Sequence, residues 1–231
     1  MCLEACRNIR KVFVTGGTGY IGRQLIPALF ARGHEVRALV RPESLGRAPA
    51  GVTTVVGNAL DASTFASAVN RTDTIVHLVG TPHPSPAKAA EFERVDLASI
   101  RASVAAARAA GIAHLVYLSV AQPAPVMRAY VDARRRGEEA IAHGGITATI
   151  VRPWYVLGPG HRWPTVLVPI VKVLEWLPAT REAARRLGFV TLAQMVAALV
   201  RAVEHPPGPA ERRVVEVPAI RGEDATPPPP R

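Results

Sequence analysis

Cysteine is scarce in this chain, and its two cysteines, Cys2 and Cys6, both lie within the first six residues. Two thiols near one end supply neither a disulfide framework nor the ligand set of a zinc site. Long hydrophobic runs are also missing, since none reaches the roughly 20 apolar residues that span a bilayer. The start MCLEACRNIRK has no apolar signal-peptide core. We therefore expect a cytoplasmic protein with no metal centre and no transmembrane segment.

Lysine is equally rare, with only Lys11, Lys88 and Lys172, so arginine supplies most of the 28 basic residues. With 18 acidic residues the formal net charge is +10. A basic balance suits nucleic acid, an anionic membrane surface or a phosphorylated ligand. The arginines are scattered, and no basic stripe is interleaved with aromatic residues. We therefore do not expect specific nucleic-acid binding.

Short apolar segments alternate with helical patterns through the first two thirds of the 231 residues. This alternation is typical of βαβ units with right-handed crossovers. It predicts an α/β fold with a doubly wound parallel sheet of the Rossmann kind. The expected strands cover 11–16, 34–41, 52–57, 73–80, 114–120 and 147–153, and the expected helices cover 20–33, 62–69, 88–110 and 128–142.

The pattern changes after Pro153. An apolar segment at 163–178 precedes a helical pattern at 191–206 and a strand pattern at 212–218. We expect core or pocket packing for 163–178; a lid, a membrane-surface helix and a dimer contact are alternatives. The predicted division is an N-terminal extension (1–10), a dinucleotide-binding core (11–155), a small C-terminal substrate lobe packed on it (156–220) and a disordered proline-rich tail (221–231).

The stretch VTGGTGYIG (14–22) joins the first expected strand to the first expected helix. Gly17, Gly19 and Gly22 form GxGxxG, and Gly16 with Gly19 and Gly22 forms GxxGxxG. Glycines let the backbone turn tightly and approach a pyrophosphate, whose charge is favoured at a helix start. In this strand–turn–helix context the pattern predicts dinucleotide binding.

The end of the second expected strand indicates which dinucleotide binds. An acidic residue there would bind a ribose hydroxyl, whereas an arginine suits a 2′-phosphate. The strand ends in Val40-Arg41 with no Asp or Glu, and Arg23 and Arg37 could add positive charge. We therefore predict NADP over NAD. The alternative is that Arg41 is a solvated loop residue.

Over residues 11–218 the chain resembles the short-chain dehydrogenase/reductase superfamily, in its atypical or extended-like branch, which includes NAD-dependent epimerase/dehydratase-like proteins. The resemblance is carried by TGGTGYIG (15–22), VVGNALD (55–61), IVHLVG (75–80), LVYLSV (115–120), YVDAR (130–134) and IVRPWYVLGPG (150–160). It implies cofactor contacts at Thr15, Gly16, Gly17, Thr18, Gly19, Tyr20, Ile21, Gly22, Arg41, Asn58, Ala59, Leu78, Val79, Gly80 and Pro153.

The resemblance also implies a catalytic set of Tyr130, Arg134 and Ser119. In the family a tyrosine is the acid/base, a lysine holds the nicotinamide ribose and lowers the pKa of the tyrosine, and a serine positions the substrate carbonyl. Tyr130 and Arg134 are four residues apart, which places them on one helix face. Arg134 replaces the lysine and cannot relay a proton. Ser119 precedes Val120, where the family often has its catalytic hydroxyl.

Two functions follow from this pattern. The first is an oxidoreductase that passes hydride between NADP and a small carbonyl or quinone-like substrate. The alternative is a non-catalytic dinucleotide binder, either a redox sensor or an accessory subunit. A nucleotide-sugar epimerase is disfavoured because the lobe is short. His83 and His161 are weaker acid/base candidates, and we expect His77 to be packed and hydrogen-bonded. This fold often pairs with a second copy through helices beside the sheet, so a homo-oligomer is a further expectation.

Overall fold

A seven-stranded parallel sheet forms the centre of the protein in the computed structural model, which describes residues 9–70, 72–124, 126–159 and 187–223. The strand order is β3-β2-β1-β4-β5-β6-β9, and each neighbouring pair is parallel. The predicted doubly wound α/β fold is confirmed. The strands are β1 (Lys11–Thr15), β2 (Glu35–Val40), β3 (Thr53–Val56), β4 (Thr74–His77), β5 (His114–Leu118), β6 (Ala148–Val151) and β9 (Arg212–Val215).

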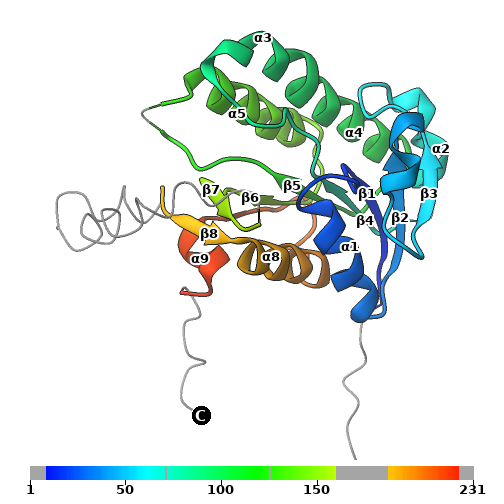
Figure 1. Cartoon of the computed structure of the whole chain (residues 1–231). Helices are drawn as coiled ribbons and strands as arrows, with labels where there is room; N and C mark the ends of the chain where they lie inside the picture. Colours follow the sequence, from blue (N-terminus) through cyan, green and yellow to red (C-terminus); the bar gives the residue numbers. More distant parts are fainter. Residues whose placement is uncertain (1–8, 71, 125, 160–186, 224–231) are drawn as a thin grey trace, which may run out of the picture.

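Helices cover both faces of the sheet (Figure 1). One face carries α1 (Gly22–Ala31), α8 (Leu192–Glu204) and α9 (Val217–Arg221). The other carries α2 (Ala66–Val69), α4 (Ala98–Ala109) and α5 (Arg128–His143). Successive strand residues alternate between two cores, so Val12 and Val14 pack toward α1 while Phe13 packs toward α4. Strands buried on both faces are apolar throughout.

The chain reverses its direction of travel across the sheet at β1 and β4. The connections from β1 lead to β2 and β3 on one side, whereas β4, β5 and β6 lie on the other. In doubly wound sheets ligands bind beyond the carboxyl ends of the strands at such a switch point. The loops after β1, β2, β3 and β4 meet at this edge and frame the site.

The segment expected as one helix over 88–110 is built from several turns. It opens with 3-10 turn η3 (Pro86–Lys88) and α3 (Ala89–Glu91), continues as the π-helical turn η4 (Phe92–Leu97), and only then becomes α4. Two further 3-10 turns, η1 (Pro42–Arg47) and η2 (Ala62–Thr64), follow β2 and β3. A π-helical turn shifts the side chains after it around the helix axis. This shift decides which residues of the segment face the sheet.

The segment expected as a separate lobe contributes to the main sheet. β9 pairs with β6 as the seventh strand, and α8 packs against α1. β7 (Tyr155–Leu157) and β8 (Phe189–Thr191) form a small parallel pair beside them. The strand expected over 212–218 ends at Val215, because Pro218 lies in the first turn of α9. The domain division itself stays a prediction.

Several sequence predictions fall outside the described residues. They concern the apolar segment 163–178, His161, both cysteines and most of the tail at 221–231. Among the helices of the described ranges, none is long and apolar enough to cross a membrane.

Candidate functional site

The glycine turn lies between β1 and α1, at the switch point. Gly16 has a φ of +76°, and its carbonyl accepts a hydrogen bond from the Gly19 N–H at 3.0 Å. A Cβ on Gly22 would lie 2.5 Å from the Gly16 oxygen and 2.6 Å from the Gly17 Cα. A Cβ on Gly16 would lie 2.9 Å from the carbonyl carbon of Leu78. The turn is therefore pressed against α1 and the end of β4, and only glycine fits at these positions.

A cleft of about 490 Å³ opens beside this turn. This volume is typical of a small-molecule or cofactor site. It is bounded by the turn, by the ends of β2 and β3, and by the loop after β4. Its lining includes Gly16, Thr18, Gly19, Leu39, Arg41, Arg47, Gly57, Asn58, Ala59, Leu60, Leu78, Val79, Gly80, Thr81, Pro82, Glu91 and Val95.

Nine of the fifteen expected cofactor residues belong to this lining. The others, Thr15, Gly17, Tyr20, Ile21, Gly22 and Pro153, are not among the lining residues. Thr15 is buried and contacts His77 with its hydroxyl, at 3.0 Å from Nδ1. A Cβ on Gly17 would meet Ile26 at 2.9 Å. The Pro153 carbonyl accepts a hydrogen bond from the Ala121 N–H. These three residues shape the site from behind its surface.

Two arginines line the cleft beyond β2. The Arg41 side chain is 63% exposed, and its Nη1 lies 3.2 Å from Glu43 Oε1. The η1 turn brings Arg47 back to the cleft, where its Nη2 donates to the Ser44 hydroxyl at 2.7 Å. Arg37 donates instead to the Ala68 carbonyl and is not among the lining residues. Arg47 was missed by the sequence prediction, although Pro42 directly after the strand favours a turn there.

Asn58 forms the floor of the cleft after β3. Its Oδ1 accepts from the Leu60 N–H at 3.0 Å, and its own N–H donates to the Thr64 hydroxyl at 3.0 Å. This is a local turn of the kind that Asn side chains favour. Asn58 therefore holds the loop that presents Ala59 and Leu60 to the cleft.

Arg134 is buried and engaged inside the protein. Its Nη2 lies 2.6 Å from Asp96 Oδ1, and its Nη1 donates to the Leu118 carbonyl at 2.8 Å. The guanidinium lies over two aromatic rings, 5.8 Å from the centre of Tyr117 and 5.3 Å from that of Tyr130. Cations are attracted to the faces of aromatic rings. All these partners are groups of the protein itself.

The charge of Arg134 is fixed. Burial alone would lower the pKa of its guanidinium, but Tyr130, Tyr117 and Asp96 outweigh burial and raise it above its ordinary value. Burial also raises the pKa of Tyr117 to about 12, although the nearby Arg134 opposes the rise. Arg134 therefore stays protonated, and Tyr117 stays a neutral phenol, at any physiological pH.

Tyr130 lies beside Arg134, as their spacing predicts. Its half-buried ring packs against Phe92 with ring centres 5.1 Å apart and planes at 59°. Phe92 begins the π-helical turn η4, so this contact joins α5 to the segment that precedes α4. Tyr130 is not among the residues lining the cleft.

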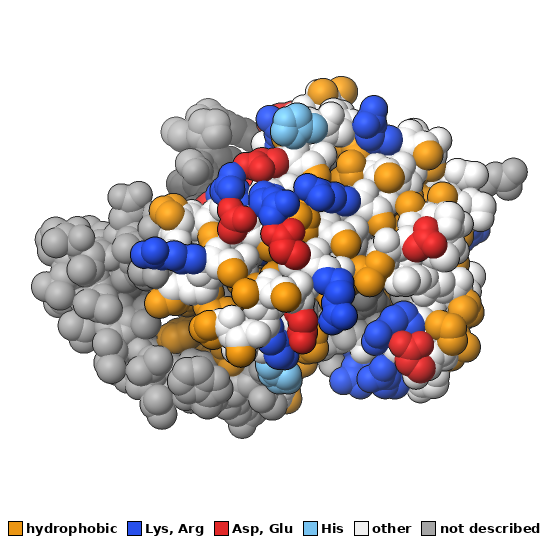
Figure 2. Space-filling model, turned by 90° about the horizontal axis from the view of Figure 1, so that it is seen from above, with side chains coloured by type: hydrophobic (Ala, Val, Ile, Leu, Met, Phe, Trp, Pro, Cys, Tyr) orange, Lys and Arg blue, Asp and Glu red, His pale blue; other side chains and the backbone are white. Residues whose placement is uncertain are grey.

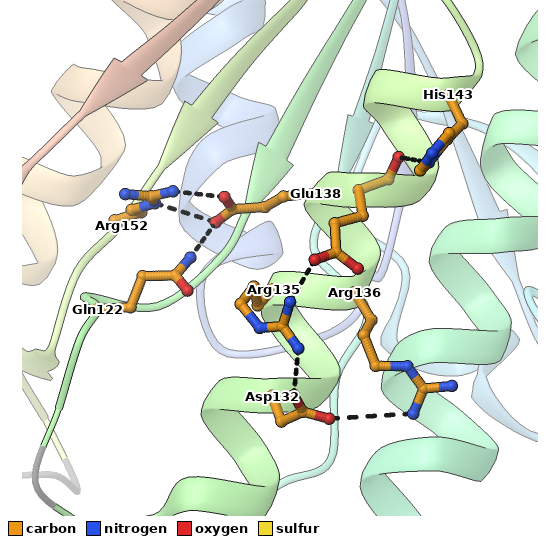
Figure 3. A network of polar contacts seen from close by, with 8 residues as sticks. Gln122, Asp132, Arg135, Arg136, Glu138, His143 and Arg152 are labelled. Carbon is orange, nitrogen blue, oxygen red and sulfur yellow. Dashed lines mark hydrogen bonds and ion pairs between the residues drawn. The ribbon is translucent and has the colours of Figure 1, made fainter.

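Ser119 follows β5 and donates its hydroxyl hydrogen to Glu138 Oε1 at 2.6 Å. The same carboxylate accepts from Gln122 Nε2 at 2.7 Å and forms an ion pair with Arg152, shown in Figure 3. Arg152 also pairs with Glu216 at 3.0 Å. Glu138 lies four residues beyond Arg134 and was missed by the sequence prediction. The network ties β5, α5 and the segment after β6 together.

The outer side of α5 carries a separate set of ion pairs. Arg135 pairs with Asp132 and Glu139, and Arg136 pairs with Glu93 (Figure 3 shows the α5 members). Figure 2 shows acidic and basic side chains interleaved on this face. Exposed pairs of this kind contribute little stability each.

The described histidines near the site differ in their surroundings. His77 is fully buried, and its Nδ1 lies 2.9 Å from the Ser103 hydroxyl. Burial, followed by the nearby charge of Arg134, lowers the pKa of His77 to about 3. His77 is therefore a packed, neutral, hydrogen-bonded histidine, as the sequence predicts. His83 is exposed in the loop after β4, with a φ of +48°.

Comparisons with known proteins agree with this geometry. A family model described as NAD(P)H-binding matches residues 16–164. A 3-diazoavenalumate denitrifying reductase from a Streptomyces species is 34% identical over 84% of this chain and 72% of its own length. The ceramide reductase of Caulobacter vibrioides is 29% identical over 75% of this chain. The chain spans only 55% of that second relative.

Solved structures share the fold at low sequence identity. A short-chain dehydrogenase/reductase superfamily protein from Agrobacterium tumefaciens with bound NAD superposes with a TM-score of 0.65 at 19% identity, covering 92% of this chain and 81% of that one. A UDP-galactose 4-epimerase gives a TM-score of 0.67 at 20% identity, covering 89% and 76%. The chain therefore belongs to the NAD(P)H-binding family and is an oxidoreductase-like protein of the atypical short-chain dehydrogenase/reductase type.

Proposed function

We propose that this protein binds NADP(H) in the cleft beside the glycine turn and passes hydride between the nicotinamide and a small carbonyl or quinone-like substrate. The observation that carries the proposal is the cleft itself, which opens at the switch point beside a turn too tight for any Cβ. Backbone amides at the start of α1 favour an anion there. The bound dinucleotide would supply the hydride; every other contribution comes from the chain.

The two ends of the cleft suit the two ends of the cofactor. Apolar side chains after β2 and β3 offer a slot for a flat base, and Arg41 and Arg47 stand beside it. Guanidinium groups bind phosphate oxygens through paired N–H donors. Glu43, the carboxylate nearest the end of β2 in sequence, is already paired with Arg41. These contacts support NADP over NAD.

The dinucleotide preference is tested by removing Arg41 and Arg47. The double variant Arg41→Ala/Arg47→Ala should weaken NADPH binding by about tenfold or more, because charge-assisted hydrogen bonds to the 2′-phosphate are lost. NADH binding should be unchanged. Arg37→Ala is the matched control, since Arg37 contacts the Ala68 carbonyl outside the cleft. Equal losses for NADPH and NADH would remove the proposed phosphate contact.

Hydride transfer is supported by the names of the relatives. The two described above are reductases, and a third, from Stigmatella aurantiaca, is a ketoreductase of a farnesyl dihydroquinoline-1-oxide, 31% identical over 64% of this chain and 51% of its own length. The named substrates differ widely, so the identity of the substrate here is not inherited from any of them. A small molecule remains the proposed partner.

We propose Tyr130 as the proton donor. Ser119 already donates its hydroxyl hydrogen to Glu138, which leaves no hydrogen on it for a substrate carbonyl. Arg134 is engaged with Asp96 and cannot relay a proton. The phenol of Tyr130, on the same face of α5, is the remaining donor of the expected set. Pro153 and the other cofactor contacts outside the lining stay predictions, as do a homo-oligomer and a cytoplasmic location.

Catalysis is tested by following NADPH oxidation with a panel of aldehydes, ketones and quinones. We expect turnover of at least one substrate, and we expect Tyr130→Phe to lower it by about a hundredfold, as for loss of a general acid. NADPH affinity of this variant should be unchanged. Unaltered turnover would remove Tyr130 from the role. Tight NADPH binding with no oxidation of any substrate would favour a redox sensor or accessory subunit.

A further inference from the structure

A buried ion pair connects α5 with the segment that precedes α4. The Arg134 and Asp96 side chains are only 4% and 0% exposed, and their Nη2 and Oδ1 atoms are 2.6 Å apart. Two charges out of water are costly unless they are paired and hydrogen-bonded. Asp96 therefore supplies the counter-charge that lets arginine occupy the position where the short-chain family carries lysine.

The second carboxylate oxygen of Asp96 reaches the loop after β4. Asp96 Oδ2 accepts from the Thr81 N–H at 3.0 Å and from the Thr81 hydroxyl at 2.6 Å. Arg134 presses on the preceding residue, since a Cβ on Gly80 would lie 2.1 Å from Arg134 Nη2. The pair thus holds Gly80 and Thr81 from two directions. Both residues line the cleft.

The π-helical turn η4 delivers Asp96 to this place. Asp96 lies within it, fully buried, whereas the neighbouring Val95 and the preceding Glu91 line the cleft. The extra residue in a π turn re-aims the side chains that follow it, and such turns are frequent at functional sites. Phe92, at the start of the same turn, packs on Tyr130.

We infer that Asp96 is a positioning residue of the dinucleotide site, acting together with Arg134 on the Gly80–Thr81 wall. This inference rests on the proposed NADP site. Gly80 and Thr81 follow β4, on the opposite side of β1 from β2 and its Arg41. Because the adenosine ribose lies at the end of β2 in such folds, the Gly80–Thr81 wall faces the nicotinamide half. The charge of Arg134 therefore acts on the cofactor through the loop, not by holding the ribose.

Two substitutions at Thr81 test this in the full chain. Thr81→Val removes the hydroxyl bond to Asp96 while leaving the ion pair and the backbone bond in place. Thr81→Ser keeps the hydroxyl and is the matched control. The probes are NADPH and 2′,5′-ADP, which carries only the adenosine half. We expect Thr81→Val to weaken NADPH about tenfold, as for loss of a hydrogen bond to a charged group. Binding of 2′,5′-ADP should not change, and Thr81→Ser should behave as wild type.

A second variant tests the charges without stranding one of them. Asp96→Asn/Arg134→Gln removes both charges and leaves two amides that can still bond. We expect this variant to fold and to lose NADPH affinity relative to 2′,5′-ADP, as Thr81→Val does. The fluorescence of bound NADPH should also shift in both variants, because it reports on the surroundings of the nicotinamide.

Three results would contradict the inference. Wild-type affinity of Thr81→Val for both probes would show that the Asp96 contact does not shape the site. Equal losses for both probes, with no rescue by serine, would indicate a merely structural role. Wild-type protein that bound neither probe would overturn the proposed NADP site, and the inference with it.

Discussion

Gly22 shows how far a single residue decides the shape of the site. A Cβ there would lie 2.5–2.7 Å from three backbone atoms of Gly16 and Gly17, none of which can rotate away. We expect Gly22→Ala to destabilise the fold by about 1–3 kcal/mol, as overpacking does, and to abolish NADPH binding. Thermal unfolding and NADPH titration measure the two effects.

Gly46 provides the control for this substitution. A Cβ on Gly46 would meet nothing within 4 Å, and its φ lies outside the left-handed region. Gly46→Ala should therefore keep both the stability and the NADPH affinity of the wild type. A Gly22→Ala protein that also kept both would contradict the tight-turn account.

His77 gives the fold a dependence on acid. Its folded-state pKa is lowered to about 3 from an ordinary 6.5, so between these values the unfolded chain binds more protons. The free energy of unfolding should then fall as pH drops from about 6.5 toward 3. His114, whose pKa burial lowers to about 4, adds in the same direction.

Urea unfolding at pH 7 and pH 5 measures this dependence. His77→Gln should show a smaller loss of stability between the two pH values than the wild type. His143→Gln is the control, because His143 is exposed at the end of α5. An unchanged pH dependence in His77→Gln would show that His77 is not the residue responsible.

Elements in this protein begin where their capping residues direct. α8 opens with a capping box in which the Thr191 hydroxyl accepts from the Gln194 N–H, while the Gln194 side chain accepts from the Thr191 N–H. α8 covers one face of the sheet and packs against α1. Its start therefore matters for the whole layer.

Thr191→Ala should lower the free energy of unfolding by about 1 kcal/mol, as for loss of an N-cap. Thr191→Ser should retain most of it, because serine keeps the hydroxyl acceptor. Chemical denaturation compares the three proteins. Equal stability of all three would show that the capping box contributes nothing measurable here.

At the level of elements, sequence periodicity predicted most helices and strands but not their irregular turns. The π-helical turn at η4 leaves no mark in the apolar spacing of 88–110, because its cause is the buried contact of Asp96 with Arg134. The 3-10 turn η1 is signalled by Pro42, yet only the folded chain shows that it returns Arg47 to the cleft.

For the whole molecule, the alternation of strands and helices predicted the parallel sheet, and the glycine turn predicted where the cofactor edge lies. β9 joining that sheet could not be predicted, since its pairing with β6 spans about sixty residues of sequence. The same applies to the partners of Ser119 and Arg134, because Glu138 and Asp96 reach them only through tertiary packing.

The arrangement of the whole molecule also limits what its charge does. The formal charge of +10 is spread over a surface where basic side chains alternate with acidic ones on the α5 face (Figure 2). At the cleft, by contrast, Arg41 and Arg47 lie together beside the end of β2. A phosphorylated cofactor is therefore the ligand that this distribution favours.

The most direct test of the account is an equilibrium titration of the full chain with NADPH and with NADH under identical salt. We predict saturable binding of both, with NADPH at least about tenfold tighter because of the 2′-phosphate contacts. Equal or tighter binding of NADH would contradict the role given to Arg41 and Arg47. Failure of either dinucleotide to bind would contradict the cleft as a cofactor site.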